Sequence, residues 1–235
     1  MVPLLPLLLA CWSLPTEVEL TGTLLDSRDG VGLAEAGIEI HDAQGTAFGE
    51  GQTGEDGEFA ITVPASQSFF VTFSDEAGGR VPTSFTGIAG SSDVQAEEGL
   101  LYMRSTQEVE DMKQEFANCA EVGATETLIE GEVRIYFSVE EDEELPTVPD
   151  VTVTAWDLND QPYSGCYLDE EGLSSADATA TASNGRFAIF GAPTGPLALS
   201  FTWVLAEGLE QTNWYLVRAP EGGVVPMYPA WVESP

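Results

Sequence analysis

The chain has 235 residues, of which 40 are acidic and 7 are basic, so its formal net charge is −33. This excess of acid excludes direct binding to DNA, RNA or anionic lipid headgroups, which depends on clustered Lys and Arg. Hydrophobic residues make up 43% of the sequence, which is enough for a folded core and excludes an acidic disordered tail.

The first eleven residues, MVPLLPLLLAC, form an uncharged apolar run that ends at Cys11. About ten apolar residues are too few to span a bilayer but match the core of a secretory signal peptide. The sequence Leu8-Leu9-Ala10-Cys11 resembles the lipobox of bacterial lipoproteins, in which the cysteine is acylated and becomes the first residue after cleavage. The resemblance implies a signal peptide over residues 1–10 and a lipidated cysteine with its tether over 11–16. Because Asp does not follow the cysteine, the resemblance to lipoproteins also implies sorting to the outer membrane. The alternative to a lipoprotein is a protein secreted without a lipid anchor.

Two segments of the chain align with one another in three blocks. The blocks pair residues 19–25 with 128–134, 37–40 with 150–153, and 53–61 with 181–189. Apolar and polar residues alternate within them, which indicates antiparallel strands with one buried face. The dipeptides Asp56-Gly57 and Asn184-Gly185 are typical of hairpin turns, because Asn, Asp and Gly tolerate positive φ. The alignment predicts two superposable β-sandwiches in which Phe59 and Phe187 are buried at matching positions.

The order of these motifs resembles the carboxypeptidase regulatory-like family, whose fold is a transthyretin-like sandwich. The first copy carries the resemblance at Gly22, Asp26, Ala36, Gly37, Thr53, Gly57 and Phe59. The second copy carries it at Gly131, Val151, Thr181, Gly185 and Phe187, and lacks the Asp after the first strand. The resemblance implies an all-β protein with two tandem seven-stranded antiparallel Greek-key β-sandwiches, at residues 17–105 and 127–235. It implies an accessory fold and little about activity.

A linker over residues 106–126 contains the one convincing helix. Residues 105–108, Ser-Thr-Gln-Glu, form a capping-box pattern, and Gly123 is placed to close the helix. Apolar residues recur at helical spacing at Val109, Met112, Phe116 and Cys119. We expect this stripe to pack against one or both sandwiches. The tail, residues 214–235, is predicted to form a final strand and an extended proline-rich wrap.

Two cysteines remain once Cys11 is lipidated, an even number in an oxidising compartment. Cys119 belongs to the predicted helix, and Cys166 to an insertion in the second copy. A bridge between them would pin the insertion to the helix. It would close a loop of about 50 residues, which contributes roughly 3–4 kcal/mol in the chain-entropy model. The alternative is two buried free thiols.

Catalytic residues are scarce. His41 is the only histidine, and the alternation of its strand places it at an exposed position. One histidine excludes the usual mechanisms of hydroxyisourate hydrolases and intradiol dioxygenases, whose sandwiches are related. The sequence has no Gly-x-Ser-x-Gly elbow, and Lys113 is its only lysine. We expect no cofactor and no enzymatic activity.

Acidic loops supply the oxygen ligands that Ca²⁺ prefers. Asp26 and Asp29 in one loop, and Asp157 and Asp160 in another, are weak candidate ligands. None of the loops follows the EF-hand spacing, so a solvated acidic loop is the simpler interpretation. The same holds for the acidic run 140–144 in the insertion, which is expected to form a mobile loop.

The predicted function is that of a non-catalytic cell-envelope lipoprotein, anchored in a membrane by lipid. It would display two sandwiches for adhesion, envelope structure or protein binding. A carbohydrate-binding module is the alternative, with exposed aromatic residues stacking on sugar rings. The aromatic candidates are Tyr136, Trp156, Trp203 and Trp214. A calcium-binding surface protein and a hydrolase have less support, and no nucleic-acid partner is expected.

The acidic excess also resembles that of proteins adapted to high salt. Glutamates recur on the strand faces expected to be exposed, at Glu17, Glu19, Glu39, Glu130 and Glu132. Because like charges opposite one another across strands are destabilising, stability is predicted to rise with ionic strength.

Overall fold

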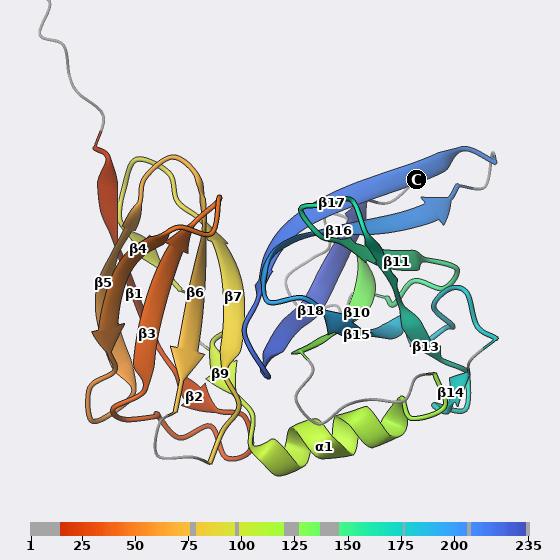
Figure 1. Ribbon diagram of the computed structural model, residues 1–235, viewed down its shortest axis with the longest axis horizontal. Coiled ribbons are helices and arrows are strands. Elements are labelled where there is room, and N and C mark those ends of the chain that lie inside the picture. Colours follow the sequence, from red (N-terminus) through yellow and green to blue (C-terminus); the bar gives the residue numbers. More distant parts are fainter. Residues whose placement is uncertain are drawn as a thin grey trace, which may run out of the picture.

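The computed structural model describes residues 15–75, 79–96, 99–119, 127–136, 146–175, 177–205 and 208–233. The predicted signal peptide, Cys11 and the acidic run 140–144 lie outside these ranges. Within them the chain is all-β, with eighteen strands and one short helix. Figure 1 shows two sandwiches side by side, with the helix running beneath the second.

The first sandwich packs a three-stranded sheet against a four-stranded one. The smaller sheet has the order β5-β1-β8, from β1 (Glu17–Thr23), β5 (Glu58–Pro64) and β8 (Val94–Gln95). The larger has the order β7-β6-β3-β4, from β3 (Gly37–Asp42), β4 (Ala47–Gln52), β6 (Ser68–Ser74) and β7 (Thr83–Ile88). A short parallel pair, β2 (Leu25–Asp26) and β9 (Tyr102–Met103), lies beside them.

The second sandwich repeats this plan with longer strands. Its outer sheet has the order β12-β11-β16-β17, from β11 (Thr152–Trp156), β12 (Pro162–Ser164), β16 (Gly195–Val204) and β17 (Glu210–Ala219). The facing strands have the order β14-β13-β15-β10-β18. They are β10 (Thr127–Tyr136), β13 (Cys166–Leu168), β14 (Ser174–Ser175), β15 (Arg186–Ala192) and β18 (Val224–Glu233). Strands β13 and β14 have no counterpart in the first sandwich and come from the insertion.

Strand order and register agree between the two copies. The order β5-β1-β8 matches β15-β10-β18, and β7-β6-β3-β4 matches β17-β16-β11-β12. Gly22 faces Phe59 across β1 and β5, and Gly131 faces Phe187 across β10 and β15. Both phenylalanines are buried. The equivalence of these positions, predicted from the aligned blocks, is confirmed.

The hairpin glycines occupy equivalent left-handed turns. Gly57 has φ +77° and Gly185 has φ +65°. A Cβ atom added to Gly57 would lie 2.4 Å from the carbonyl oxygen of Leu24, and one added to Gly185 would lie 2.6 Å from that of Val133. Leu24 and Val133 each follow the strand glycine of their copy by two residues, so the same turn meets the same backbone in both sandwiches.

A buried threonine performs the same task in each copy. Thr53 Oγ1 accepts the N–H of Ala36 at 3.0 Å and donates to the carbonyl of Leu33. Thr181 Oγ1 accepts the N–H of Val151 at 3.0 Å and donates to the carbonyl of Val148 at 2.7 Å. Each hydroxyl thereby satisfies two buried backbone groups that no strand partner reaches. This explains why a threonine opens the third aligned block in both copies.

The sandwiches share one continuous sheet. Strand β18 runs parallel to β7, where Val224 faces Thr83, and the Val224 N–H donates to the carbonyl of Pro82 at 2.8 Å. The predicted proline-rich wrap is therefore wrong over residues 224–233, which form a strand along β10. Because β7 pairs with β18 only at Val224, the prolines of β18 lie where no ladder hydrogen bond to β7 is needed.

Helix α1 (Thr106–Glu115) begins with the predicted capping box. The Ser105 hydroxyl accepts the N–H of Glu108 at 3.2 Å, and the Glu108 carboxylate accepts the N–H of Ser105 at 2.8 Å. The helix ends at Phe116, well before Gly123, because the chain then turns toward β14, where the Asn118 N–H donates to Ser174 Oγ at 3.1 Å.

The apolar stripe of α1 covers one sheet of the second sandwich. It packs in a buried cluster that contains Val109, Met112, Phe116, Leu128, Cys166, Leu168, Ala188 and Val224. Helix α1 and its C-cap contribute the first three residues, and strands β10, β13, β15 and β18 contribute the others. No helix within the described ranges has the length and hydropathy needed to cross a bilayer.

Candidate functional site

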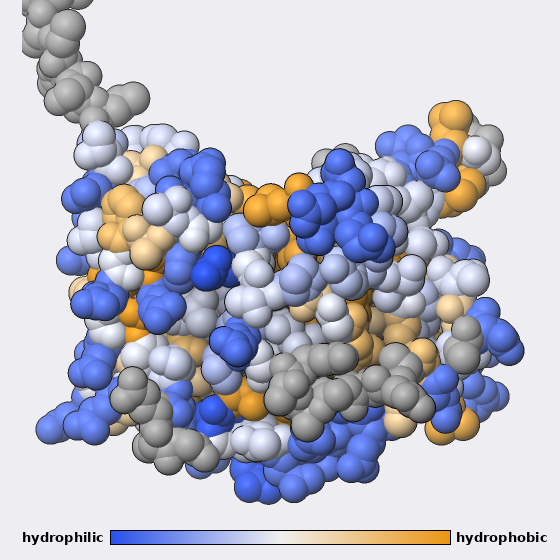
Figure 2. Space-filling view, viewed as in Figure 1, coloured by the Kyte–Doolittle hydropathy of each residue, from blue (hydrophilic) through white to orange (hydrophobic). Residues whose placement is uncertain are grey.

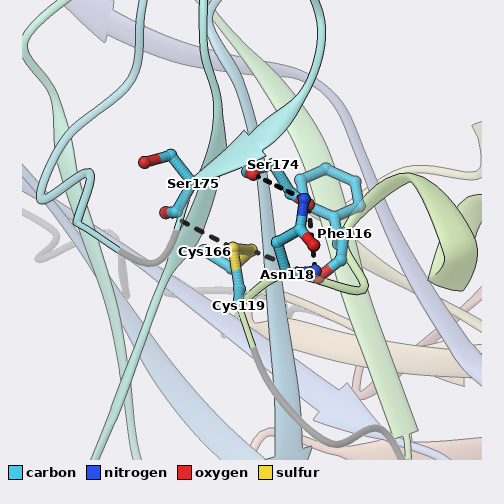
Figure 3. The surroundings of a disulfide bond; sticks show 6 residues. All are labelled: Phe116, Asn118, Cys119, Cys166, Ser174 and Ser175. Carbon is cyan, nitrogen blue, oxygen red and sulfur yellow. Dashed lines mark hydrogen bonds between the residues drawn. A yellow bond between two sulfur atoms is a disulfide. The ribbon is translucent and has the colours of Figure 1, made fainter.

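A disulfide joins the turn after α1 to the inserted strand β13. Figure 3 shows Cys119 bonded to Cys166, with their Cα atoms 5.7 Å apart. The Asn118 side-chain amide next to it donates to the carbonyl of Ser174 at 3.2 Å. The bridge and these hydrogen bonds attach the insertion to the segment that links the two sandwiches.

A buried ion pair connects the start of α1 to β10. Arg104 Nη2 lies 3.0 Å from Glu130 Oε1, and the Glu130 side chain is 1% exposed. The guanidinium also lies 5.4 Å from the ring centroid of Tyr102. The sequence placed Glu130 on an exposed face, which is wrong. Alternation gave its side of the sheet correctly, but α1 and Arg104 cover that side.

His41 is also buried, contrary to the expectation that it would be exposed; it is 8% exposed. It lies on the outer face of β3, and the second sandwich covers this region. A Cβ atom on Gly45, in the turn after β3, would lie 2.5 Å from Pro196 and 3.2 Å from Arg218 Nη1. Burial first, and then the positive charge of Arg218, lower the pKa of His41. Its Nδ1 is buried and has no hydrogen-bond partner among the described residues.

The two aspartates of the first candidate calcium loop are engaged in local interactions. Asp26 pairs with Arg80, which also lies 3.2 Å from Asp75. Burial opposes ionisation of Asp26, but the N–H of Arg28 and the Arg80 guanidinium outweigh it and lower the pKa of Asp26. Asp29 Oδ1 accepts the N–H of Val31 at 3.0 Å. A carboxylate bound to arginine is a poor ligand for a cation.

The second candidate loop is a β-turn. Asp157 Oδ1 accepts the N–H groups of Asn159 at 2.8 Å and Gln161 at 2.9 Å, and these bonds lower the pKa of Asp157. Asp160 occupies the left-handed region with φ +58°. Within the described ranges, no three His, Cys, Asp or Glu side chains come together in a group that could hold a metal ion. The structure thus assigns these aspartates to turn formation.

A cleft of about 510 Å³ lies between α1 and the end of the first sandwich. Its lining includes Ser27, Arg104, Glu108 and Asp111. Ser27 Oγ donates to Glu108 Oε1 at 2.8 Å. Burial raises the pKa of Glu108, but hydrogen bonds from Ser105 outweigh this effect and lower it, so the carboxylate is a weak base. Among the described residues that line this cleft, no pair is arranged for acid–base or nucleophilic catalysis.

The aromatic candidates separate into two groups. Trp203 points into the core of the second sandwich and is 7% exposed, so its predicted role in sugar binding is wrong. The side chain of Tyr136 lies outside the described part of the structure. Trp156 and Trp214 both lie on the outward face of the sheet β12-β11-β16-β17, with Trp214 60% exposed. The sequence carried a signal for the burial of Trp203, because strand alternation places it on the same face as Leu197, Leu199 and Phe201, which are also buried.

Searches against protein-family models and against curated proteins found no match. Solved structures with partial similarity include the TIE protein of Bacillus anthracis, at 14% identity and a TM-score of 0.33 over 93% of this chain and 34% of that one. This chain thus spans about a third of that protein. The minor pilin GBS52 of Streptococcus agalactiae is 12% identical, with a TM-score of 0.28 over 92% of this chain and 94% of that one.

A third structure with partial similarity is the 3-chlorocatechol 1,2-dioxygenase of Rhodococcus opacus, at 14% identity. Its TM-score is 0.26, over 31% of this chain and 43% of that one. Likeness at this level gives no information on activity, and the residues of this chain must supply the functional argument.

Proposed function

We propose that the protein is a non-catalytic lipoprotein of the cell envelope that displays two transthyretin-like sandwiches as one rigid unit for adhesion or docking. The observation that supports this most is the continuous sheet formed where β18 meets β7. Two domains that share a sheet cannot rotate freely about a linker, unlike domains joined by a small polar interface.

Three further contacts hold the sandwiches together, each through different chemistry. The first is the buried ion pair in which Arg104 Nη2 lies 3.0 Å from Glu130 Oε1. The Thr86 hydroxyl donates to the carbonyl of Leu216 at 2.8 Å. Helix α1 follows directly from the first sandwich and packs on the second. A rigid pair of domains suits a protein that must present a surface at a fixed distance from its anchor.

The anchor in this proposal is Cys11, from the lipobox-like sequence that ends there. Strand β1 begins at Glu17, so the intervening chain could span at most about 20 Å. The first sandwich would then lie close to the membrane surface. The absence of Asp after Cys11 favours the outer membrane as the site of the anchor. A short tether and a strongly acidic surface together favour an upright unit held away from anionic headgroups.

Metabolic labelling with a palmitate analogue tests the anchor. The wild-type chain should incorporate label and partition into detergent, whereas Cys11→Ser should remain unlabelled. Ser13→Ala, two residues further on, is the matched control and should behave as wild type. Release of an unlabelled wild-type protein into the medium would overturn the lipoprotein proposal and leave plain secretion.

A further inference from the structure

We propose that the outward face of the sheet β12-β11-β16-β17 binds a neutral polysaccharide, with Trp156 and Trp214 as its stacking platform. This deepens the proposed display function by naming a partner class, and it rests on that function only for its biological setting. The strands concerned belong to the long β16–β17 hairpin and its neighbour β11, which Figure 1 shows at the outer side of the second sandwich.

The two indoles lie on either side of one serine. Ser200 faces Trp214 across β16 and β17, and the Trp156 indole N–H donates to Ser200 Oγ at 3.1 Å. Because Trp156 lies on β11, its Cα is about two strand spacings, or roughly 10 Å, from β17. The hydrogen bond directs the indole of Trp156 toward the row that holds Trp214. The pair therefore spans more than one sugar ring along a chain.

The fixed position of Trp156 matters for binding. Its indole N–H is already bonded and its ring is half-buried, so it loses little conformational freedom when a ligand stacks on it. Trp214 is 60% exposed and provides the open surface. Tryptophan combines a large apolar face with low conformational entropy, which is why truncation of a contacting tryptophan often costs much of the binding energy.

Charge on this face differs from that of the rest of the molecule. By the strand register, the charged outward residues in the described part of this sheet are Glu210, at the hairpin end, and Arg218, next to the first sandwich. The whole chain, by contrast, has a formal net charge of −33. Figure 2 shows hydrophilic residues over much of the visible surface, with apolar residues at the hairpin end. The turn that follows Trp156 adds Asp157 and Asp160 at the rim of this face. The charges therefore lie at the edges, and the centre of the face between the two tryptophans matches an uncharged ligand.

Hydroxyl-bearing residues share the outward face of this sheet with the two indoles. Four threonines point outward from β11, β16 and β17: Thr152, Thr154, Thr202 and Thr212. Thr202 Oγ1 and Thr212 Oγ1 lie 3.0 Å apart, and Ser200 Oγ contacts the carbonyl of Thr154 at 3.4 Å. Hydroxyls both donate and accept, as sugar hydroxyls do. Few large aliphatic side chains lie here, which distinguishes this face from the apolar centre of a protein interface.

Affinity electrophoresis of the full chain, solubilised in detergent, tests the proposal. The probes are native gels that contain barley β-glucan, laminarin, glucomannan or dextran, with alginate as an acidic polysaccharide. We expect retardation in at least one neutral gel and none in alginate. Trp214→Ala and Trp156→Ala should each weaken the apparent affinity at least about tenfold. Val31→Ala is the control, because Val31 is 60% exposed in the loop after β2 of the first sandwich, a strand that does not meet β17.

Thermal melts of both tryptophan variants establish that they fold, so a lost interaction is not mistaken for unfolding. Wild-type migration unaffected by every neutral polysaccharide would overturn the proposal, as would tryptophan variants retarded as strongly as wild type. A wild-type dimer that Trp214→Ala converts to a monomer would assign this face to self-association instead. Failure here leaves palmitate labelling unchanged, so it is distinguishable from failure of the lipoprotein proposal.

Discussion

Arg104 and Glu130 form an ion pair at 3.0 Å that joins the residue before the α1 cap to the first strand of the second sandwich. Glu130 is almost fully removed from water, at 1% side-chain exposure, and Arg104 is 16% exposed. A buried pair of this kind contributes little net stability over an apolar pair, but loss of one partner leaves an uncompensated charge. Its value here is in fixing how the two sandwiches meet.

Arg104→Ala should therefore lower the free energy of unfolding by about 3–5 kcal/mol, because it strands the Glu130 carboxylate in the interface. The double variant Arg104→Ala with Glu130→Leu should recover part of this loss. Arg134→Ala is the matched control, because Arg134 pairs with the more exposed Glu132 and should cost about 1 kcal/mol or less. Urea denaturation measures all three. Equal losses for Arg104→Ala and Arg134→Ala would contradict the assigned role.

The Cys119–Cys166 bridge is testable by peptide mapping without reductant, which should recover the two cysteine peptides as one linked species. The Cα separation of 5.7 Å lies within the range that a disulfide spans without backbone movement. Cys166→Ser should cost roughly 3–4 kcal/mol in the chain-entropy model. Full labelling of both thiols in unfolded, unreduced protein would show that the bridge is absent.

Local pattern predicted the repeated parts of the fold. Gly22 and Gly131 were matched by sequence alone, and the structure places each opposite the buried phenylalanine of its own copy. Thr53 and Thr181 opened the same aligned block, although their hydrogen bonds to buried backbone groups could not be read from the sequence. Short-range signals sufficed because turn chemistry and strand alternation act over a few residues.

The sequence could not show which parts of the protein cover the outward faces of the sheets. Alternation placed His41 and Glu130 on the sides of their strands away from the core, and it was right about the side. It could not show that the second sandwich covers His41 or that Arg104 covers Glu130, since these partners are distant in sequence.

Stability should fall on mild acidification through His41. Burial and Arg218 lower the pKa of His41 in the folded protein, while Glu39 and Asp42 act in the opposite direction. The unfolded chain, with an ordinary pKa near 6.5, then binds more protons than the folded one below that pH. The free energy of unfolding thus falls as the pH drops through about 6.5, and this loss stops once the folded protein also binds the proton.

Urea denaturation of wild type and His41→Gln at pH 7.5 and 5.5 measures this contribution as a difference between the two proteins. Between these two pH values the free energy of unfolding of the wild type should fall by up to about 1.4 kcal/mol more than that of the variant. This limit follows because pH 5.5 lies one unit below the ordinary histidine pKa. The pKa values of Asp26 and Glu108 are also lowered in the folded protein. The stability that these carboxylates provide is lost only below the pH range of this experiment, as they become protonated. Identical changes in wild type and variant would remove His41 as the cause.

Salt should stabilise the protein, and one strand pair should account for part of the effect. Glu39 on β3 and Glu50 on β4 face one another across exposed positions. Opposed like charges destabilise a strand pair by roughly 0.2–1 kcal/mol. The Debye length falls from about 10 Å at 0.1 M to about 3 Å at 1 M, so this repulsion should fade over that range.

Thermal melts in 0.1 M and 1 M NaCl should show a rise in Tm for the wild type and a smaller rise for Glu50→Gln. Glu58→Gln is the matched control, because Glu58 faces Thr23 across β1 and β5. This substitution removes the same charge without relieving an opposed pair of like charges. CaCl₂ at matched ionic strength separates screening from specific binding, since a bound ion would saturate at millimolar concentration. Equal salt responses for Glu50→Gln and wild type would mean that the repulsion is spread over the whole surface. A jump in millimolar calcium alone would instead point to a metal site outside the turns formed by Asp26 and Asp157.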